Sequence, residues 1–324
     1  MIVGYDGGYG YAKGASERGV AVLPAALAPA VEIRYRSDLH SNGAGLTVQV
    51  DGKPWFVGEL ARRQGLNPIS PRTRERSAEF ERVLLVAALH ELDARESVAL
   101  VAGRPVAWYG DRGTLETALR GYHHAEVNGE LAVYNVTDAK IVPQPFGTLF
   151  GVILDEEGAL LDPDGLRDGQ VAILDVGMYT SDYAVSDALH YVEERSGSIP
   201  YAMSNVYGLL QKRLSYRYGR ELTLEEAEET AKERGFRDWG EWEAVDDYVE
   251  AALEQVAERV VGEAQTLWGD GRDLDTVLVT GGGGAAMFEA VRARFPQAQL
   301  VEAAQTANAR GFYRYAVRCF GASE

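Results

Sequence analysis

The stretch Val171–Asp182 reads V-A-I-L-D-V-G-M-Y-T-S-D. Four apolar residues lead into the acidic Asp175, and Gly177 then lets the chain reverse sharply, because glycine readily adopts positive φ. The apolar run Tyr183–Val185 predicts a returning strand, so the stretch is typical of a β-hairpin. Its tip would present backbone N–H groups, a hydroxyl and a carboxylate, which suit a phosphate and an accompanying magnesium ion. The same residue types also end many ordinary hairpins, and the stretch alone leaves that simpler interpretation open.

A similar acid-then-glycine pattern opens the chain and suggests that the fold contains an internal repeat. Residues 1–13 read M-I-V-G-Y-D-G-G-Y-G-Y-A-K, an apolar strand ending at Asp6, a double-glycine turn and a returning strand that carries Lys13. Asp6 and Asp175 lie about half a chain apart, which suggests two similar halves. Lys13 can curl back over the turn toward a phosphate; a surface lysine at a strand end is the alternative.

A third glycine-rich turn, Gly281–Gly284, follows an expected strand, Thr276–Thr280, and opens an expected helix. Three such turns spread over the chain can converge on one nucleotide only if that nucleotide lies between two domains. The third turn also satisfies a dinucleotide-binding fingerprint, with Glu302 as the acidic residue about 20 positions later. That alternative fails because too few residues follow Glu302 to complete a mononucleotide-binding half.

Together these motifs resemble those of the actin-like ATPase superfamily, and within it the bacterial and archaeal proteins of the plasmid-partition ParM/StbA type. Asp6 with Lys13 resembles the first phosphate motif of the family. The other motifs follow in the family's order, as connecting segment, second phosphate motif, adenosine motif and closing segment: Ile141–Gly147, Asp175–Asp182, Val277–Gly284 and Asn308–Tyr313. The pattern departs at Met178 and Tyr179, where the family usually has glycine and threonine.

The resemblance implies an α/β fold of two similar actin-like domains of the ribonuclease H-like type. Each domain would be a mixed sheet flanked by helices, with a nucleotide cleft between the two domains. The first domain would span 1–153, with a small β-rich subdomain at about 31–70. The second would span 154–324, with a small helical subdomain at about 217–242. The last helix, at about 306–320, would pack back on the first domain.

The resemblance also implies a site for Mg-ATP, with GTP as the alternative nucleotide. Asp6 and Asp175 would hold Mg²⁺ largely through its water molecules, because that ion gives up water reluctantly. Gln144, fixed between two prolines, would orient the attacking water, so the expected catalytic residues are Gln144, Asp175 and Asp6. Alternatively, Gln144 only satisfies backbone groups at the crossover between domains. The expected nucleotide contacts are Gly7, Gly8, Tyr9, Lys13, Gly177, Met178, Tyr179, Thr180, Gly281, Gly282 and Gly283.

The composition of this 324-residue chain limits what it binds and where it works. The formal net charge of −17 argues against direct binding to nucleic acid or an anionic membrane, which needs clustered lysine and arginine. The one cysteine, Cys319, excludes an intramolecular disulfide and fits a reducing compartment. No apolar run reaches the length of about 18 residues that a membrane span needs, so we expect a cytoplasmic protein. One segment, 71–76 or P-R-T-R-E-R, is basic, and is either a solvated helix start or a contact with a subunit or adaptor.

The resemblance therefore implies an ATPase that forms nucleotide-dependent, head-to-tail filaments with itself. Any role in plasmid segregation would need a DNA-binding adaptor protein, because the chain is too acidic to bind DNA directly. Two alternatives lie in the same superfamily: a small-molecule kinase of the sugar or acetate type, and a non-polymerising ATP-binding scaffold. A kinase needs a carboxylate that accepts a substrate proton, for which Asp182 is the extra candidate. Asp6, Lys13, Gln144 and Asp175 argue against a scaffold that hydrolyses nothing.

Overall fold

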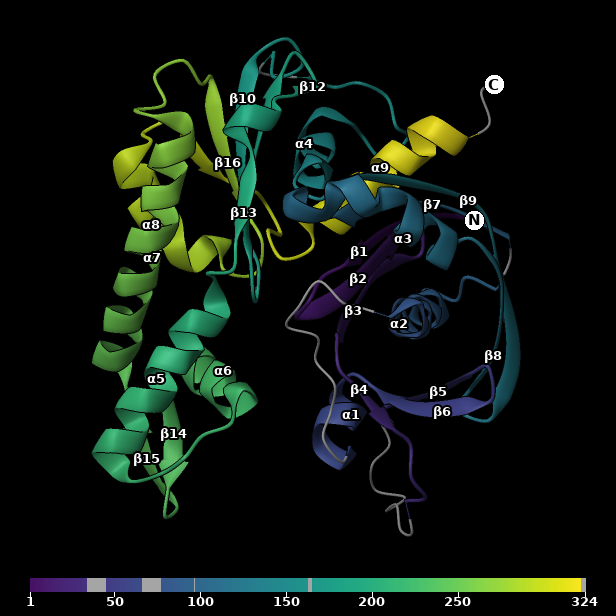
Figure 1. The fold of residues 1–324 in the computed structure, drawn as a ribbon, viewed down its shortest axis with the longest axis horizontal. Helices are drawn as coiled ribbons and strands as arrows, with labels where there is room; N and C mark the ends of the chain where they lie inside the picture. Colours follow the sequence, from purple (N-terminus) through teal and green to yellow (C-terminus); the bar gives the residue numbers. More distant parts are fainter. Residues whose placement is uncertain (34–44, 66–76, 96, 163–164, 322–324) are drawn as a thin grey trace. The chain divides into compact units, whose positions relative to one another are not determined.

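The computed structural model divides the chain into two compact units, each built from a mixed β-sheet and helices (Figure 1). It describes residues 1–33, 45–65, 77–95, 97–162 and 165–321. Unit 1 comprises Met1–Arg167 and Thr306–Glu324, and unit 2 comprises Asp168–Gln305. The chain thus enters unit 2 at Asp168, later than the expected start of the second domain at 154. The basic segment 71–76 and parts of the expected subdomain at 31–70 lie outside the described residues.

Unit 1 is organised around a long mixed sheet. Its strands are β1 (Ile2–Gly7), β2 (Tyr11–Ser16), β3 (Gly19–Pro24), β4 (Leu27–Pro29), β5 (Leu46–Val50), β6 (Lys53–Val57), β7 (Ser97–Arg104), β8 (Gly121–Val127) and β9 (Glu130–Pro143). They pair in the order β3-β2-β1-β7-β9-β8-β5-β6-β4. The helices of unit 1 are α1 (Glu59–Gln64), α2 (Ala78–Glu91), the 3₁₀ helix η1 (Val106–Asp111), α3 (Arg112–Leu119), α4 (Phe146–Ile153) and α9 (Ala307–Phe320).

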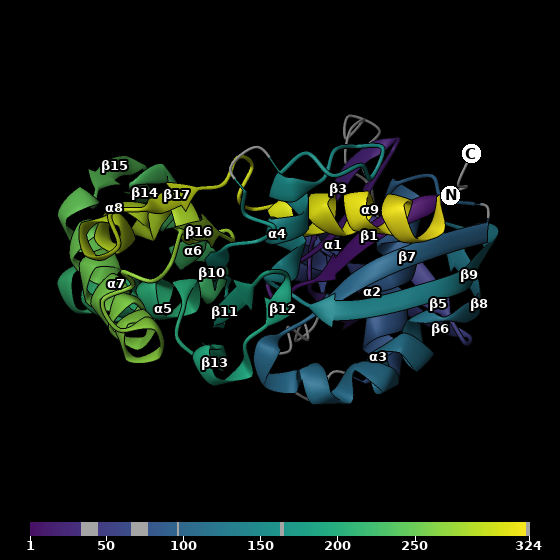
Figure 2. The same ribbon diagram turned by 90° about the horizontal axis from the view of Figure 1, so that it is seen from above.

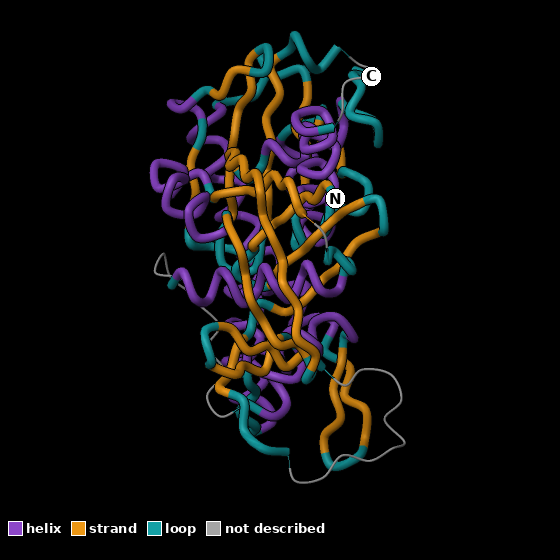
Figure 3. Tube along the Cα trace, turned by 90° about the vertical axis from the view of Figure 1, so that its right-hand side faces the viewer, coloured by secondary structure: helices purple, strands orange, loops and turns teal. Residues whose placement is uncertain are grey.

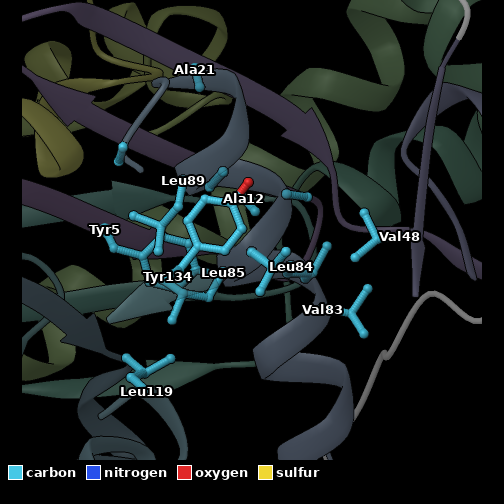
Figure 4. Packing of buried hydrophobic residues seen from close by; sticks show 14 of the residues in the cluster. Tyr5, Ala12, Ala21, Val48, Val83, Leu84, Leu85, Leu89, Leu119 and Tyr134 are labelled. Carbon is cyan, nitrogen blue, oxygen red and sulfur yellow. The ribbon is translucent and has the colours of Figure 1, made fainter. Parts of the chain in front are cut away.

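The core of unit 1 forms around α2, which Figure 1 shows end-on with strands of the sheet around it. The helix begins where the Ser77 hydroxyl accepts a hydrogen bond from the Phe80 N–H, at 3.1 Å. Leu84, Leu85 and Leu89 are fully buried and pack among strand residues (Figure 4). Burial of one such side chain stabilises the fold by about 1.5–3 kcal/mol, so α2 fixes the sheet that carries the candidate site.

The last helix, α9, belongs to unit 1, where it packs against α4, β1 and β7 (Figure 2). Gly311 lies where α9 meets α4, and a side chain there would collide with the Gly147 carbonyl oxygen. Only glycine permits this close approach of the two backbones. The Asn308 side-chain oxygen also accepts hydrogen bonds from the Thr148 N–H and hydroxyl, at 3.0 and 2.8 Å. These contacts attach α9 to α4, and the packing of α9 against β1 joins it to the beginning of the chain.

Unit 2 is built on a shorter mixed sheet. Its strands are β10 (Gln170–Val176), β11 (Ser181–Asp187), β12 (His190–Tyr191), β13 (Gly197–Ile199), β14 (Gly235–Asp238), β15 (Glu241–Ala244), β16 (Thr276–Thr280) and β17 (Ala298–Leu300). Its helices are the 3₁₀ helix η2 (Glu193–Arg195), α5 (Met203–Tyr218), α6 (Leu224–Glu233), α7 (Asp246–Trp268) and α8 (Gly284–Arg294). The main sheet has the order β12-β11-β10-β16-β17, with β13 also paired to β11, and β14 pairs with β15 alone. Across the described ranges, no helix combines enough length with enough apolar character to cross a membrane.

Five strands of each sheet share one order and direction, which is the predicted internal repeat. In unit 1, β3, β2 and β1 are antiparallel neighbours, and β7 and β9 then follow in parallel. In unit 2, β12, β11 and β10 are antiparallel neighbours, and β16 and β17 then follow in parallel. Asp6 lies in β1 and Asp175 lies in β10, so both acids occupy the equivalent strand. The predicted α/β fold of two similar halves, with helices beside mixed strands (Figure 3), is confirmed.

The segment expected as a small helical subdomain, 217–242, contains one helix and a β-hairpin. A capping box opens α6, where Thr223 and Glu226 each accept a hydrogen bond from the other's backbone N–H. The strands β14 and β15 then pair around a two-residue turn, Trp239 (φ 48°) and Gly240 (φ 91°). Sequence patterns miss this hairpin because such turns usually carry Asn-Gly or Asp-Gly rather than Trp-Gly.

Candidate functional site

In unit 1, two of the predicted site residues converge on the buried carboxylate of a third. Asp6 is 1% exposed and lies directly opposite Lys13 across β1 and β2. Lys13 Nζ lies 2.8 Å from Asp6 Oδ2, and Gln144 Nε2 donates a hydrogen bond to Asp6 Oδ1 at 3.0 Å. Both carboxylate oxygens are therefore paired, as a buried charge requires.

Strand pairing and a chain crossover bring these residues together. Asp6 and Lys13 share a face of the sheet because residues directly opposite each other in an antiparallel pair point to the same side. Gln144 is 138 positions from Asp6 in the sequence and arrives at the end of β9. Its backbone N–H donates to the Arg104 carbonyl at 2.8 Å, which fixes it beside the end of β7. The sheet order thus brings Gln144 near the glycine turn that follows Asp6.

The first predicted phosphate turn, Gly7 and Gly8, joins β1 to β2. The ring of Tyr9, a predicted nucleotide contact, is 8% exposed and meets Trp108 edge-on, with ring centroids 5.2 Å apart. Tyr9 therefore supports the turn from inside unit 1, and its ring is not presented to solvent. Gly7 and Tyr9 line a small cavity together with Arg104 and other residues of unit 1.

In unit 2, the second predicted hairpin places two carboxylates side by side. Asp175 of β10 lies directly opposite Asp182 of β11, and the two residues are 4% and 3% exposed. The hairpin is closed by a hydrogen bond from the Gly177 N–H to the Thr180 carbonyl at 2.9 Å. The Thr180 hydroxyl donates to Asp182 Oδ2 at 3.2 Å. Like charges directly opposite one another are unfavourable, so a cation would stabilise this arrangement.

Asp182 was predicted only as the proton-accepting carboxylate of the kinase alternative, and was not among the predicted nucleotide or metal contacts. The signal that would find it is the register of the hairpin, in which Val176 pairs with Ser181 and Asp175 therefore faces Asp182. The register depends on the length of the turn, and the sequence alone does not show which residues form the turn and which residues pair. Asp182 thus joins the site through strand pairing.

The departures from the family pattern, Met178 and Tyr179, lie at the tip of this hairpin. Met178 packs against the hydrophobic core of unit 2. The carbonyls of Gly177 and Met178 accept hydrogen bonds from the N–H groups of Met203 and Ser204, at 3.3 and 2.7 Å. These N–H groups open α5, so the helix start holds the hairpin tip in place. Tyr179 is half-buried.

The third predicted turn, Gly281–Gly283, lies directly beside Asp175. Thr280 pairs with Asp175 across β16 and β10, and Gly281 follows with φ 86°. A side chain at Gly281 would collide with Asp175 Oδ1 and with the Val176 carbonyl oxygen. The Gly283 N–H donates to the same Val176 carbonyl at 2.9 Å, immediately before α8 begins. Unit 2 therefore unites the second and third predicted turns, including Gly282, at one end of its sheet.

The carboxylates of these clusters fit the chemistry of magnesium. Mg²⁺ prefers oxygen ligands, keeps several water molecules, and binds one or two carboxylates together with substrate phosphates. Asp6 in unit 1 and Asp175 with Asp182 in unit 2 supply such carboxylates, each next to a glycine turn. Lys13 adds a cation suited to a phosphate. The two clusters therefore have the residue types that a Mg-nucleotide requires.

Both units match family models, which together span most of the chain. Residues 4–147 match the N-terminal domain of actin-like proteins, and residues 173–292 match the C-terminal domain of the archaeal actin homologue MreB-like family. The repeated sheet and its acid-bearing hairpins thus define a two-domain protein of the actin-like class. The chain belongs to the actin-like superfamily.

Solved structures share this fold over nearly the whole chain. The archaeal actin homolog Ta0583 superposes with a TM-score of 0.84 at 20% identity, over 99% of this chain and 100% of that one. A pCBH ParM non-polymerisable quadruple mutant gives 0.80 at 21% identity, over 98% and 99%. A 15-stranded ParM filament from Clostridium botulinum gives 0.80 at 20% identity, over 98% and 99%. Ta0583 has also been solved in complex with ADP. A search of curated proteins finds no match to this chain.

Proposed function

We propose that this chain is an ATPase that binds Mg-ATP and assembles into nucleotide-dependent filaments. The observation that carries the proposal is the buried Asp6, which is held by Lys13 and Gln144 beside a glycine turn. The pair Asp175 and Asp182 beside Gly281 gives unit 2 a matching cluster. The complex of an archaeal relative with ADP supports a nucleotide of the ATP type.

In this proposal, both units supply groups that bind the Mg-nucleotide. Asp6 and Asp175 would hold Mg²⁺ largely through its water molecules, and the ion would supply positive charge to the phosphates. Lys13 and the backbone N–H groups of the Gly7-Gly8 turn bind phosphate oxygens. On the unit 2 side, Gly177 and Thr180 bind the phosphates. The turn Gly281–Gly283 lets the backbone approach adenosine, because no side chain stands in the way.

Gln144 positions the attacking water in this mechanism. Its Nε2 donates to Asp6, and this bond orients the carboxamide so that Oε1 can accept a hydrogen bond from water. The water oxygen attacks the γ-phosphorus as the bond from that phosphorus to the β-phosphate oxygen breaks, and the water proton passes to an oxygen of the released phosphate. A neutral carboxamide orients the water without acting as a strong base, which suits a reaction that depends on positioning.

Nucleotide binding and hydrolysis would control filament assembly in this proposal. The ParM relative solved as a filament supports self-association. A head-to-tail contact joins two different surfaces and therefore grows an open filament. Because the chain carries a net charge of −17, a role in plasmid segregation in the cytoplasm would depend on a DNA-binding adaptor protein.

Light scattering and electron microscopy of the purified protein, with and without Mg-ATP, test the proposal. We expect scattering to rise and filaments to appear with Mg-ATP at micromolar protein, and GTP in place of ATP tests nucleotide preference. Nucleotide turnover without any assembly, and dependent on a small-molecule acceptor, would instead indicate a kinase.

Gln144→Ala separates the binding and hydrolysis roles of the site. The variant should bind nucleotide as the wild type does, because Lys13 and the glycine turns remain. Its turnover should fall by about 10²-fold, the scale expected when a reacting group loses its orientation. Single-turnover hydrolysis and fluorescent-nucleotide binding measure the two effects. Loss of binding in this variant would show that Gln144 acts on the nucleotide rather than on water.

A further inference from the structure

The β14–β15 hairpin of unit 2 presents an aromatic side chain that the fold itself does not need. Trp239 is 99% exposed and adopts φ 48° at the turn, where Asp238 pairs with Glu241. Left-handed backbone is unfavourable for a bulky residue, and Asn or Asp would stabilise this turn better. An indole that is fully exposed at an unfavourable position is typical of a binding anchor.

The hairpin is held rigidly from its base. Arg237 Nη1 donates to the Gly240 carbonyl at 3.0 Å across the turn. Arg220 Nη1 in turn donates to the Arg237 carbonyl at 2.8 Å, and its guanidinium lies 5.4 Å from the centre of the Phe236 ring. Trp239 is therefore presented by an ordered support, which lowers the entropy cost of binding through it.

A cavity of about 250 Å³ beside the hairpin is lined by carboxylates and an aromatic wall, and also by Arg220 and Arg237. These two guanidiniums are already engaged, with Glu226 and with the Gly240 carbonyl. Glu229 and Glu233 line it from α6, one helical turn apart on the same face, and Trp242 lines it from β15. Both glutamates are exposed, and in the part of the chain that the structure describes neither has a lysine or arginine partner. Carboxylates next to an indole suit a guanidinium, which can pair with the acids and stack on the ring.

This surface and one particular segment of the same chain carry opposite net charges. The stretch 221–243, which contains α6 and the hairpin, carries nine aspartates and glutamates against three lysines and arginines. The segment 71–76 carries three arginines, Arg72, Arg74 and Arg76, against one glutamate. In a chain of net charge −17, contacts between copies need such oppositely charged patches to overcome general repulsion.

We propose that segment 71–76 of one copy binds the acidic aromatic surface of a second copy. We define that surface as Glu229, Glu233, Trp239 and Trp242. Arginines of the segment pair with the two carboxylates and stack on the two indoles. The proposal rests on the proposed function, since it assigns one contact by which copies assemble. Because the segment and the surface differ, the contact is heterologous and leaves each end of an assembly open to another copy.

Charge reversal on each side of the contact tests the proposal by sedimentation of the full chain in Mg-ATP. The segment variant is Arg72→Glu, Arg74→Glu and Arg76→Glu together, and the surface variant is Glu229→Lys with Glu233→Lys. We expect each variant to raise the protein concentration needed for pelleting at least about tenfold, which corresponds to the loss of one charge-complementary contact. A protein that carries both sets of changes should pellet nearly as the wild type does, because the reversed charges again attract.

A matched control makes the same charge change elsewhere on unit 2. Glu254 and Glu258 are exposed one helical turn apart on α7, so Glu254→Lys with Glu258→Lys should pellet as the wild type does. Nucleotide binding, measured on every variant, checks that the units are folded. Wild-type pelleting by either single-sided variant, or no recovery when the two sets are combined, overturns the contact. So does a wild type that binds nucleotide but stays monomeric. A wild type that pellets through this contact without binding nucleotide would instead refute the proposed function alone.

Discussion

Replacing Lys13 with methionine tests whether the Asp6 cluster is as tightly coupled as its geometry indicates. Lys13 Nζ lies 2.8 Å from Asp6 Oδ2, and the two side chains are 12% and 1% exposed. Methionine keeps an unbranched apolar side chain and removes the ammonium group. The variant therefore retains most of the packing and leaves the buried carboxylate of Asp6 without its cation.

The structure sets the size of the expected loss in the free energy of unfolding. Removing one partner of a buried ion pair costs about 3–5 kcal/mol, because the remaining charge stays buried without compensation. The hydrogen bond from Gln144 to Asp6 Oδ1 remains, which places the expected loss at the lower end, near ~3 kcal/mol. For a unit of roughly 150–250 residues, this corresponds to a fall in melting temperature of about 6–12 °C.

Urea denaturation and thermal melting at neutral pH measure the effect. In Asp6→Asn with Lys13→Met, no uncompensated charge is left, so most of the lost stability should return. Lys53→Met is the matched control, because Lys53 is 65% exposed in its pair with Glu79 and should cost at most about 1 kcal/mol. A loss below about 1 kcal/mol for Lys13→Met, or a double variant as unstable as Lys13→Met, would refute the buried-pair reasoning.

Two further predictions concern unit 2 and the pH dependence of unit 1. Gly281→Ala should destabilise unit 2 by more than about 1 kcal/mol, because its methyl group would meet Asp175 Oδ1 at an unfavourable φ. Gly282→Ala should melt nearly as the wild type does, since its new methyl would meet only Gln305 at 4.0 Å; equal melting of the two variants would contradict the close approach. Burial lowers the pKa of His123, so the unfolded chain binds more protons and stability should fall as the pH drops below about 6.5. His123→Gln should flatten this dependence in urea titrations, and an unchanged slope would rule out His123 as its source.

The sequence by itself determined the class of fold and the local geometry of its turns. An apolar run that ends in an acid and a glycine turn specifies a hairpin through short-range preferences alone, and this held at both Asp6 and Asp175. The repetition of that pattern half a chain apart predicted two similar halves, and five strands of each sheet do share one order. The placement of Lys13 opposite Asp6 also follows from hairpin pairing, since few residues separate them.

Tertiary structure decided the features that depend on pairing and packing between distant elements. Gln144 reaches Asp6 only because β7 pairs with β1 and β9 pairs with β7. Gly281 contacts Asp175 only because β16 pairs with β10. Asp182 joined the site through strand register, and the Trp239 hairpin formed where the residue pattern favoured a helical subdomain. The preference of one residue for helix or strand amounts to a fraction of a kcal/mol. Burial and strand pairing override these preferences, and they depend on residues far away in the chain.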